Sequence, residues 1–344
     1  MYGTGAASRV EHAEENNSCW EITMTANTQR STRGRRTTIA VGVAAALTGI
    51  LAGCGHDGTA AASHSAASHS AASHSAASHS AASTPGRPAS GLHMVTNHGH
   101  KLAFHVTPGH LPAIVLDAGG GNDSSYWKNI VPALARKTGS EVITYDRAGM
   151  GASDPVPGPW KAQNAVSDLE AGLNKLGATH DVILVSHSEA GEIATYAARK
   201  DPGRFAGAVL VDASLPQFST DTEIARVAAA TQAQVKAIKA KKDTSVTKAD
   251  RQLLAVADGY VEDQRAYHRI AWPASVPATV VVSAKTPFPT SPPDATAWRA
   301  AQAEFAGAAP NRTLVTAARS SHDIPLDRPG LVEAQIEAMV KAAR

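Results

Sequence analysis

Ser188 stands where an apolar segment meets a helix-like segment. The run Val182-Ile-Leu-Val is typical of a buried strand, and a helix is expected to follow the serine. In a sharp turn from strand to helix only small residues fit two positions away from the central one, and Ser186 and Ala190 occupy those positions. Ser188 is therefore the predicted nucleophile, although neither flanking residue is the glycine of the Gly-x-Ser-x-Gly pattern.

A serine hydroxyl needs a neighbouring base, and His322 is the candidate. It lies in a polar loop, Arg319–Asp327, which follows the last predicted strand and precedes the last predicted helix. A base in such a loop could reach back to Ser188. His187 is adjacent to the serine on a tight turn, so its side chain should point elsewhere and pack structurally.

Two backbone N–H groups must stabilise the oxyanion that forms when the serine attacks. A glycine-rich turn, Ala118–Gly121, directly follows a predicted strand. We expect one donor at Gly119 or Gly120 and the other at Glu189, the residue after the nucleophile. The turn has no Gly-Lys-Ser sequence, which argues against a phosphate-binding loop.

The elements that must position these residues alternate between short apolar runs and helix-like stretches, which indicates a mostly parallel sheet covered on both faces. The predicted strands are Leu92–Thr96, Leu102–Val106, Ala113–Leu116, Glu141–Tyr145, Val182–Ser186, Ala208–Asp212, Thr279–Ser283 and Thr313–Thr316. The predicted helices are Tyr126–Lys137, Ala162–Leu176, Gly191–Lys200 and Leu331–Ala343. The strand pattern stops over residues 213–277, where Thr222–Lys242 has the spacing of a long helix. We interpret this insertion as a helical cap.

From about Leu92 to the C-terminus the chain resembles an α/β-hydrolase-fold serine hydrolase. Four segments carry the resemblance in order: the turn Ala118–Gly121, Asp146–Ser153 with the sequence DRAGMGAS, the turn at Ser188, and Ser321–Leu326. The resemblance implies an α/β fold with a mostly parallel eight-stranded sheet, a Ser-His-acid triad, no cofactor or metal, and an ester, lactone or amide substrate. Asp117 departs from the histidine that many members carry at this position.

The resemblance also implies an acid that orients the histidine, usually placed after the seventh strand. Here the first acid beyond Thr279–Ser283 is Asp294, at the far end of a Pro-rich stretch expected to be a loop. A variant of the fold places the acid after the sixth strand, where Asp212 lies. We favour Asp212, with Asp294 as the alternative; Asp323 is disfavoured because it adjoins the base.

Composition excludes several classes of function. The chain has 32 Lys plus Arg and 30 Asp plus Glu, a net charge of +2, so it has no basic field that would attract nucleic acid. Aromatic residues make up 5%, too few for a base-stacking surface. The two cysteines are Cys19 and Cys54, which leaves no disulfide framework or thiolate metal site downstream.

The first 53 residues are typical of a leader and export signal, and Met24 is a second candidate start. Arg35 and Arg36 precede the uncharged run Ile39–Ala52, which is short for a membrane span. The sequence ending at Cys54 resembles a bacterial lipobox, which predicts a lipid anchor on this cysteine at the outer face of the cytoplasmic membrane. The paired arginines fit both a twin-arginine signal and a general basic region.

Residues 54–90 are predicted to form a disordered linker before a domain at 91–344, with a cap at 213–277. Between Ser63 and Ala82 the unit Ser-His-Ser-Ala-Ala repeats, and this composition cannot bury enough apolar surface to fold. The histidines of the repeat are His64, His69, His74 and His79. Metal binding is the alternative role for them, but a five-residue period suits no fixed metal geometry.

The sequence thus predicts an exported, lipid-anchored serine hydrolase that cleaves a carboxylic ester or lactone through an acyl-enzyme on Ser188. Its expected partners are a small-molecule acyl substrate and the membrane. The alternatives are a non-catalytic binding protein that keeps the fold and an acyltransferase- or haloperoxidase-like member with the same triad.

Overall fold

The computed structural model describes residues 88–344. The predicted leader, the predicted lipidation site at Cys54 and the histidine repeat lie outside the described residues. Among the residues described, no helix has the length and hydropathy needed to cross a membrane.

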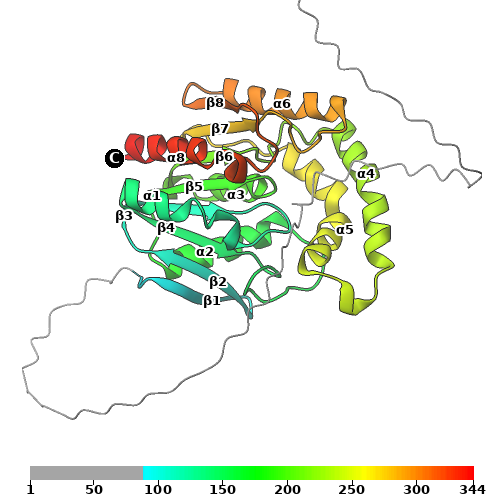
Figure 1. The fold of residues 1–344 in the computed structure, drawn as a ribbon, viewed down its shortest axis with the longest axis horizontal. Helices are drawn as coiled ribbons and strands as arrows, with labels where there is room; N and C mark the ends of the chain where they lie inside the picture. Colours follow the sequence, from blue (N-terminus) through cyan, green and yellow to red (C-terminus); the bar gives the residue numbers. More distant parts are fainter. Residues whose placement is uncertain (1–87) are drawn as a thin grey trace, which may run out of the picture. The chain divides into compact units, whose positions relative to one another are not determined.

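The described chain is built on an eight-stranded sheet with the order β1-β2-β4-β3-β5-β6-β7-β8 (Figure 1). The first three strands in this order pair antiparallel, and all later neighbours pair parallel. The strands are β1 Gly91–Asn97, β2 His100–Thr107, β3 His110–Asp117, β4 Ser140–Asp146, β5 Val182–His187, β6 Phe205–Val211, β7 Ala278–Ser283 and β8 Arg312–Ala317. The predicted mostly parallel eight-stranded sheet is therefore confirmed.

Helices cover both faces of the sheet, as the continuous apolar strands β3, β5 and β6 require. The α-helices are α1 Val131–Thr138, α2 Ala162–Lys175, α3 Ala190–Lys200, α4 Asp221–Lys239, α5 Lys248–His268, α6 Pro292–Gly307, α7 Ile324–Asp327 and α8 Pro329–Ala343. Short 3₁₀ helices occupy η1 Ser124–Trp127, η2 Pro202–Arg204 and η3 Asp243–Ser245. One core cluster joins the sheet to α2 and α3, and a second joins the opposite face to α1 and α8.

The insertion between β6 and β7 consists of α4 and α5, which we call the cap helices (Figure 1). Each begins at a threonine whose side chain accepts a hydrogen bond from the third backbone N–H of the helix: Thr220 from Glu223 and Thr247 from Asp250. Asp250 also bonds back to the N–H of Thr247, which completes a capping box. These caps define where both helices start.

Three parts of the chain differ from the prediction. The helix expected over Tyr126–Lys137 is divided into η1 and α1, with Pro132 in the first turn of α1. Helix α5 was not expected. The Pro-rich stretch is a loop as far as Ser291, but Asp294 is not on it: Pro292 and Pro293 occupy the first turn of α6, where a missing N–H costs no helical hydrogen bond, and Asp294 follows them in the helix.

Candidate active site

Ser188 occupies the turn between β5 and α3 with a backbone φ of 55°. This left-handed conformation is unfavourable for a residue with a side chain, so the surrounding packing must hold it. The N–H of Ser188 donates to the carbonyl of Val211, and its carbonyl accepts from the N–H of Ser214 at 2.8 Å. The turn is thus tied to the end of β6, and the Ser188 side chain lines a cavity next to the cap helices.

His322 connects Ser188 to Asp212. Its Nε2 lies 2.8 Å from the Ser188 Oγ, and its Nδ1 lies 2.7 Å from an Asp212 carboxylate oxygen. An ionised Asp212 can only accept, so the proton resides on Nδ1 and the free Nε2 lone pair faces the serine hydroxyl. The structure therefore brings three sequence-predicted residues into the arrangement of a nucleophile, a base and an orienting acid.

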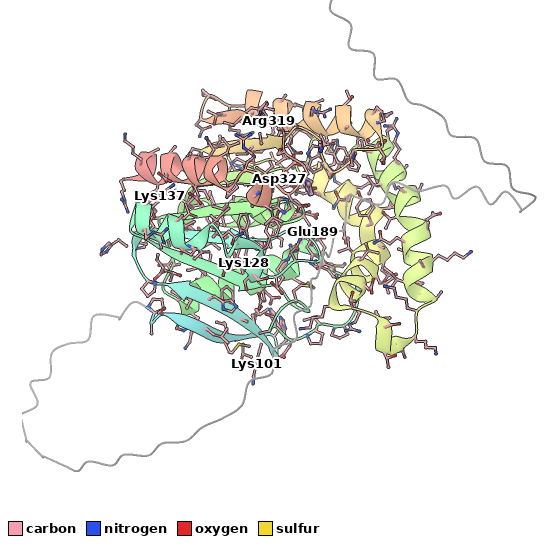
Figure 2. All side chains as sticks on the ribbon, in the orientation of Figure 1. Lys101, Lys128, Lys137, Glu189, Arg319 and Asp327 are labelled. Atoms are coloured by element: carbon pink, nitrogen blue, oxygen red, sulfur yellow. The ribbon has the colours of Figure 1, made fainter. Side chains whose placement is uncertain are left out.

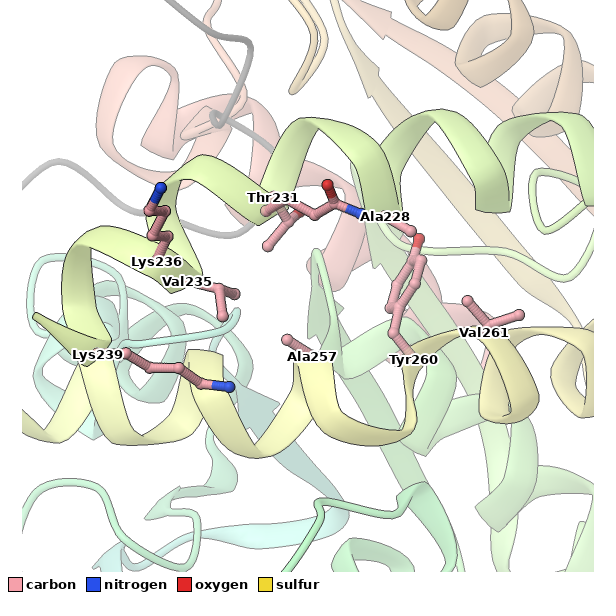
Figure 3. Close-up of a pocket in the computed structure, with 9 residues that line it drawn as sticks. Ala228, Thr231, Val235, Lys236, Lys239, Ala257, Tyr260 and Val261 are labelled. Carbon is pink, nitrogen blue, oxygen red and sulfur yellow. The ribbon is translucent and has the colours of Figure 1, made fainter.

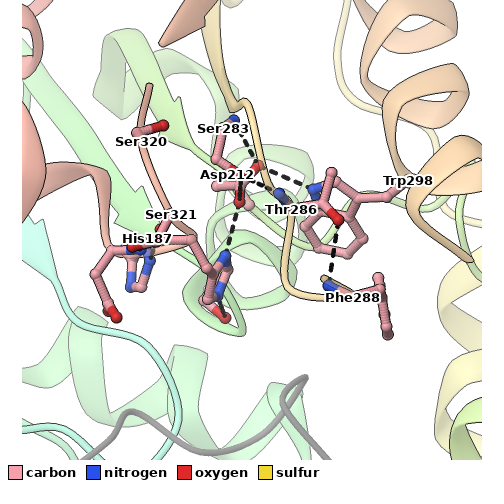
Figure 4. Close-up of polar contacts among 12 residues, drawn as sticks. His187, Asp212, Ser283, Thr286, Phe288, Trp298, Ser320 and Ser321 are labelled. Atoms are coloured by element: carbon pink, nitrogen blue, oxygen red, sulfur yellow. Dashed lines mark hydrogen bonds and ion pairs between the residues drawn. The ribbon is translucent and has the colours of Figure 1, made fainter. Parts of the chain in front are cut away.

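The Asp212 carboxylate is fully buried and accepts hydrogen bonds from three groups besides His322 (Figure 4). The backbone N–H and hydroxyl of Ser283 and the indole Nε1 of Trp298 are the donors. Burial alone raises the pKa of this carboxyl, but the bonds from His322 and Ser283 outweigh it and hold the pKa of Asp212 below its ordinary value. Neither Ser283 nor Trp298 was predicted to contact the acid, although Ser283 ends a strand that the sequence predicted, β7.

The other two candidate acids point elsewhere. Asp294, in the first turn of α6, accepts from Ser291 and pairs with Arg226 at 3.4 Å. Asp323 accepts a hydrogen bond from the hydroxyl of Tyr126 at 3.1 Å. Neither carboxylate has a hydrogen bond or ion pair with His322 in the described structure, so Asp212 is the acid that contacts the histidine.

His187 packs between Tyr126 and His322. Its ring centroid lies 4.9 Å from that of Tyr126 and 4.7 Å from that of His322, and its Nε2 donates to the His322 carbonyl at 3.1 Å. Burial lowers the pKa of His187 to about 3, so the ring is neutral and does not repel a positive charge on His322. The residue expected to pack structurally therefore supports the loop that carries the base.

The glycine turn approaches the nucleophile closely. A Cβ on Gly119 would lie 2.9 Å from the Cβ of Ser188, a distance that excludes any larger residue. A Cβ on Gly120 would instead meet the Glu189 carboxylate. In the described part of the chain, no hydrogen-bond acceptor is assigned to the N–H of Gly119 or of Glu189. These two amides remain available beside Ser188 for an oxyanion.

Arg147, which was not among the predicted site residues, bonds to this turn. Its guanidinium donates to the Gly119 carbonyl at 2.7 Å and pairs with Glu189 at 3.3 Å. Figure 2 shows Glu189 near α5, where Gln252 donates to the same carboxylate at 2.9 Å. Burial raises the pKa of Glu189, which Arg147 and Gln252 partly counteract.

Asp117, which replaces the histidine common in the resembled family, lies under the same turn. It accepts from the hydroxyl of Tyr145 at 2.7 Å, and Arg147 lies 3.9 Å away. Burial raises the pKa of Asp117 to about 6. Asp117 therefore helps to position Arg147, which in turn bonds to the glycine turn.

In the described structure three cavities border the cap helices, and one of them, about 300 Å³, lies between α5 and the segment that leads into α2. A cavity of about 60 Å³ is lined by Ser188, Glu189 and mostly apolar side chains from α4, α5 and α6. A larger one, about 500 Å³, lies between α4 and α5 (Figure 3) and is lined by no member of the Ser188-His322-Asp212 set. Tyr260 lines both the cavity beside Ser188 and this larger one. Within residues 88–344, no group of three or more His, Cys, Asp or Glu side chains could hold a metal ion.

Comparison with protein families matches residues 114–335 to the α/β hydrolase family. A probable transporter of Hormonema carpetanum is 36% identical over 122 residues, which are 33% of this chain and 17% of that protein. The matched segment spans less than half the length of each curated relative, between 17% and 43%.

Solved structures share the fold over most of the chain. An esterase from Thermogutta terrifontis has a TM-score of 0.51 and 22% identity, with 73% of this chain and 98% of that chain covered. An enol-lactonase from Burkholderia xenovorans has a TM-score of 0.50 and 19% identity, with 72% and 99% covered. At these identities the likeness shows the fold alone.

Proposed function

Since the chain belongs to the α/β hydrolase family, we propose that it is a serine hydrolase that cleaves a carboxylic ester or lactone through an acyl-enzyme on Ser188. The observation that carries this proposal is the bridging of Ser188 and Asp212 by His322, at 2.8 and 2.7 Å. The esterase and lactonase among proteins of the same fold support the substrate class.

In the acylation step the Ser188 Oγ attacks the carbonyl carbon while His322 Nε2 takes the hydroxyl proton. The negative charge that forms on the carbonyl oxygen is stabilised by the amides of Gly119 and Glu189. Asp212 stabilises the imidazolium through the Nδ1 proton. When the tetrahedral intermediate collapses, the alkoxide leaves and receives the proton from His322, and the acyl group stays on Ser188.

In the second step His322 takes a proton from water, and the hydroxide oxygen attacks the acyl carbon. The bond to the Ser188 Oγ breaks, and the serine recovers its proton from His322. The same groups therefore serve both steps, and neither step requires a metal or cofactor.

A fluorophosphonate probe on the full-length protein tests the proposal. We expect covalent labelling of the wild type, none of Ser188→Ala, and strongly reduced labelling of His322→Ala. Turnover of p-nitrophenyl esters of graded chain length should follow the same order. Ser321→Ala is the matched control, because that hydroxyl bonds to Asp327 and not to the triad. Equal labelling of the wild type and Ser188→Ala would place the reactive nucleophile elsewhere and refute the role of Ser188. A folded wild type that neither reacts nor turns over any ester would indicate a binding protein instead.

The lipobox-like sequence at Cys54 supports the further proposal that the protein is exported and lipid-anchored at the outer face of the cytoplasmic membrane. A diacyl anchor with N-acylation suffices for stable attachment, since each buried methylene contributes about 0.8 kcal/mol. Cys54→Ala should release the protein from the membrane fraction or change its processing, whereas Cys19→Ala should do neither. Unchanged fractionation and processing of Cys54→Ala would refute the anchor.

A further inference from the structure

The cavity beside Ser188 contains a carboxyl group that the proposed reaction does not use. Glu192 lies in the first turn of α3, the helix that begins two residues after the nucleophile. Its side chain lines the same cavity of about 60 Å³ as Ser188. Only 2% of Glu192 is exposed, so a carboxyl in this position needs a partner or a function.

Glu192 stands at the end of a directional hydrogen-bond chain. The hydroxyl of Ser219 donates to Gln264 Oε1 at 2.7 Å, and Gln264 Nε2 donates to Glu192 Oε2 at 2.8 Å. All three residues are buried. Since Gln264 is oriented by Ser219, its amide presents a donor to Glu192 and leaves the other carboxyl oxygen of Glu192 without a hydrogen-bond partner among the described residues.

The surroundings favour a neutral Glu192. No Lys, Arg or His side chain within residues 88–344 forms an ion pair with it, and the nearest charged groups include Glu189 and Asp263. Burial raises the pKa of Glu192 to about 8. At neutral pH its carboxyl therefore carries a proton, which it can donate while still accepting from Gln264.

We propose that Glu192 determines substrate specificity by hydrogen bonding to a hydroxyl group on a short acyl chain, so that the preferred substrates are hydroxyacyl esters or lactones. This inference rests on the proposed ester hydrolysis at Ser188. A cavity of about 60 Å³ beside the nucleophile accommodates a short acyl group. Glu192 follows Ser188 by four residues and lines the same cavity, so an acyl group held on Ser188 would share this space with the Glu192 carboxyl.

The rest of the cavity wall is largely apolar, with Phe218, Val256, Phe288 and Trp298 among its residues. Of the polar residues that also line it, Glu189 is bonded to Arg147 and Gln252, and Gln264 is bonded to Ser219 and Glu192 itself. A site that offers a buried hydrogen-bonding group rejects an analogue lacking the matching group, because the buried group then stays unpaired.

Isosteric ester pairs test this proposal on the full-length protein. In p-nitrophenyl 3-hydroxybutanoate, as separate enantiomers, and p-nitrophenyl 3-methylbutanoate, a hydroxyl replaces a methyl group of similar size. The 2-hydroxypropanoate and 2-methylpropanoate esters form a second pair. Each kcat/KM is divided by the hydroxide-catalysed rate of the same ester, because the hydroxyl changes intrinsic reactivity. The wild type should prefer one hydroxylated ester by roughly three- to tenfold, the range of one net hydrogen bond.

Two substitutions test whether the preference for the hydroxylated ester depends on Glu192. Glu192→Met keeps the volume but removes the polar group, and it should abolish the preference by slowing only the hydroxylated ester. Glu192→Gln retains a donor and an acceptor and should restore the preference. Val256→Ala is the control for cavity shape, and it should change both members of a pair alike.

The outcomes separate this proposal from the proposed function. Turnover of the esters with equal normalised rates within both pairs would overturn the role of Glu192 and leave ester hydrolysis intact. A preference that persists in Glu192→Met would also overturn it. Failure of the folded wild type to hydrolyse any ester would overturn both proposals.

Discussion

Asp212 shows how a single buried carboxylate is kept ionised for a role beside a histidine. Without partners a carboxylate that is 0% exposed would carry a large desolvation cost. Ser283 and Trp298 supply donors that satisfy it independently of His322. The carboxylate is therefore held in place before His322 becomes charged, which is the condition for orienting the imidazole without reorganisation.

Replacing Asp212 with asparagine should lower kcat by roughly 10³–10⁴-fold, because the amide no longer selects the tautomer with the proton on Nδ1. The variants Asp212→Asn and Asp294→Asn are compared in p-nitrophenyl ester turnover, with circular dichroism as a check on folding. Asp294→Asn should retain most of its turnover, since Asp294 interacts with Ser291, Arg226 and Glu223 and has no hydrogen bond or ion pair with His322 in the described structure. A reversed result would assign the acid to α6.

At the scale of elements, the junction of β5 and α3 depends on a close approach to the end of β6. A Cβ on Gly191 would lie 2.5 Å from the Ser214 carbonyl oxygen and 2.7 Å from the Ala213 Cβ. Neither atom belongs to a flexible side chain that could move aside. The small residues around Ser188 thus allow α3 to start directly against the segment that follows Asp212.

Gly191→Ala should therefore destabilise the fold by roughly 1–3 kcal/mol, the usual cost of overpacking, and should reduce labelling of Ser188. Gly330→Ala is the matched control in α8. A Cβ there meets no atom within 4 Å, and alanine is the better helix former. Chemical denaturation measures both variants. Equal stability of Gly191→Ala and the wild type would show that the junction can relax.

Tyr260 on cap helix α5 lies where two cavities meet the same side chain. Tyr260 lines both the cavity beside Ser188, about 60 Å³, and the cavity of about 500 Å³ between α4 and α5. Tyr260→Ala should join the two spaces and increase kcat/KM for esters of long acyl chains relative to short ones, measured on a p-nitrophenyl ester series. Val261→Ala, which changes the outer cavity only, should leave the chain-length profile unaltered. An unchanged profile in Tyr260→Ala would mean that the outer cavity does not accept substrate.

At the scale of the whole molecule, buried carboxyl groups link stability to pH in opposite directions. Burial raises the pKa of Asp117 to about 6 and that of Glu192 to about 8. As the pH rises from about 4 towards these values, the unfolded chain loses the protons first, so both groups reduce the free energy of unfolding. Burial also acts on Asp212, but hydrogen bonds lower its pKa, so its contribution is lost only as the pH falls below about 4.

The wild type should therefore become less stable between pH 5 and pH 8, and Glu192→Gln should weaken this decline. The gap in melting temperature between Glu192→Gln and the wild type should shift in favour of the variant as the pH rises through this window. Thermal melts at pH 5, 6.5, 8 and 9 measure the shift. Glu262→Gln is the control, because Glu262 is exposed on the same cap helix as Gln264. A gap that does not change with pH would show that Glu192 is ionised in the folded protein.

The sequence by itself determined the sheet and the location of the strand-to-helix turn at Ser188. These features depend on local properties that can be read along the chain: continuous apolar strands, small residues at Ser186 and Ala190, and glycines after β3. Residues close in sequence at such a turn are also close in space. The glycine turn lies beside Ser188 because β3 and β5 are parallel neighbours, with Asp117 paired to Ser186 at their ends.

Only the tertiary structure decided which acid contacts His322 and which groups surround it. Asp212 and Asp294 both follow strands that end near the histidine, and the sequence cannot show that α6 starts at Pro292 and directs Trp298 towards Asp212. Glu192 was invisible as a cavity residue because its partner, Gln264, is 72 residues away on a cap helix. Such contacts between distant segments depend on how elements pack together, and no local pattern in the chain records that packing.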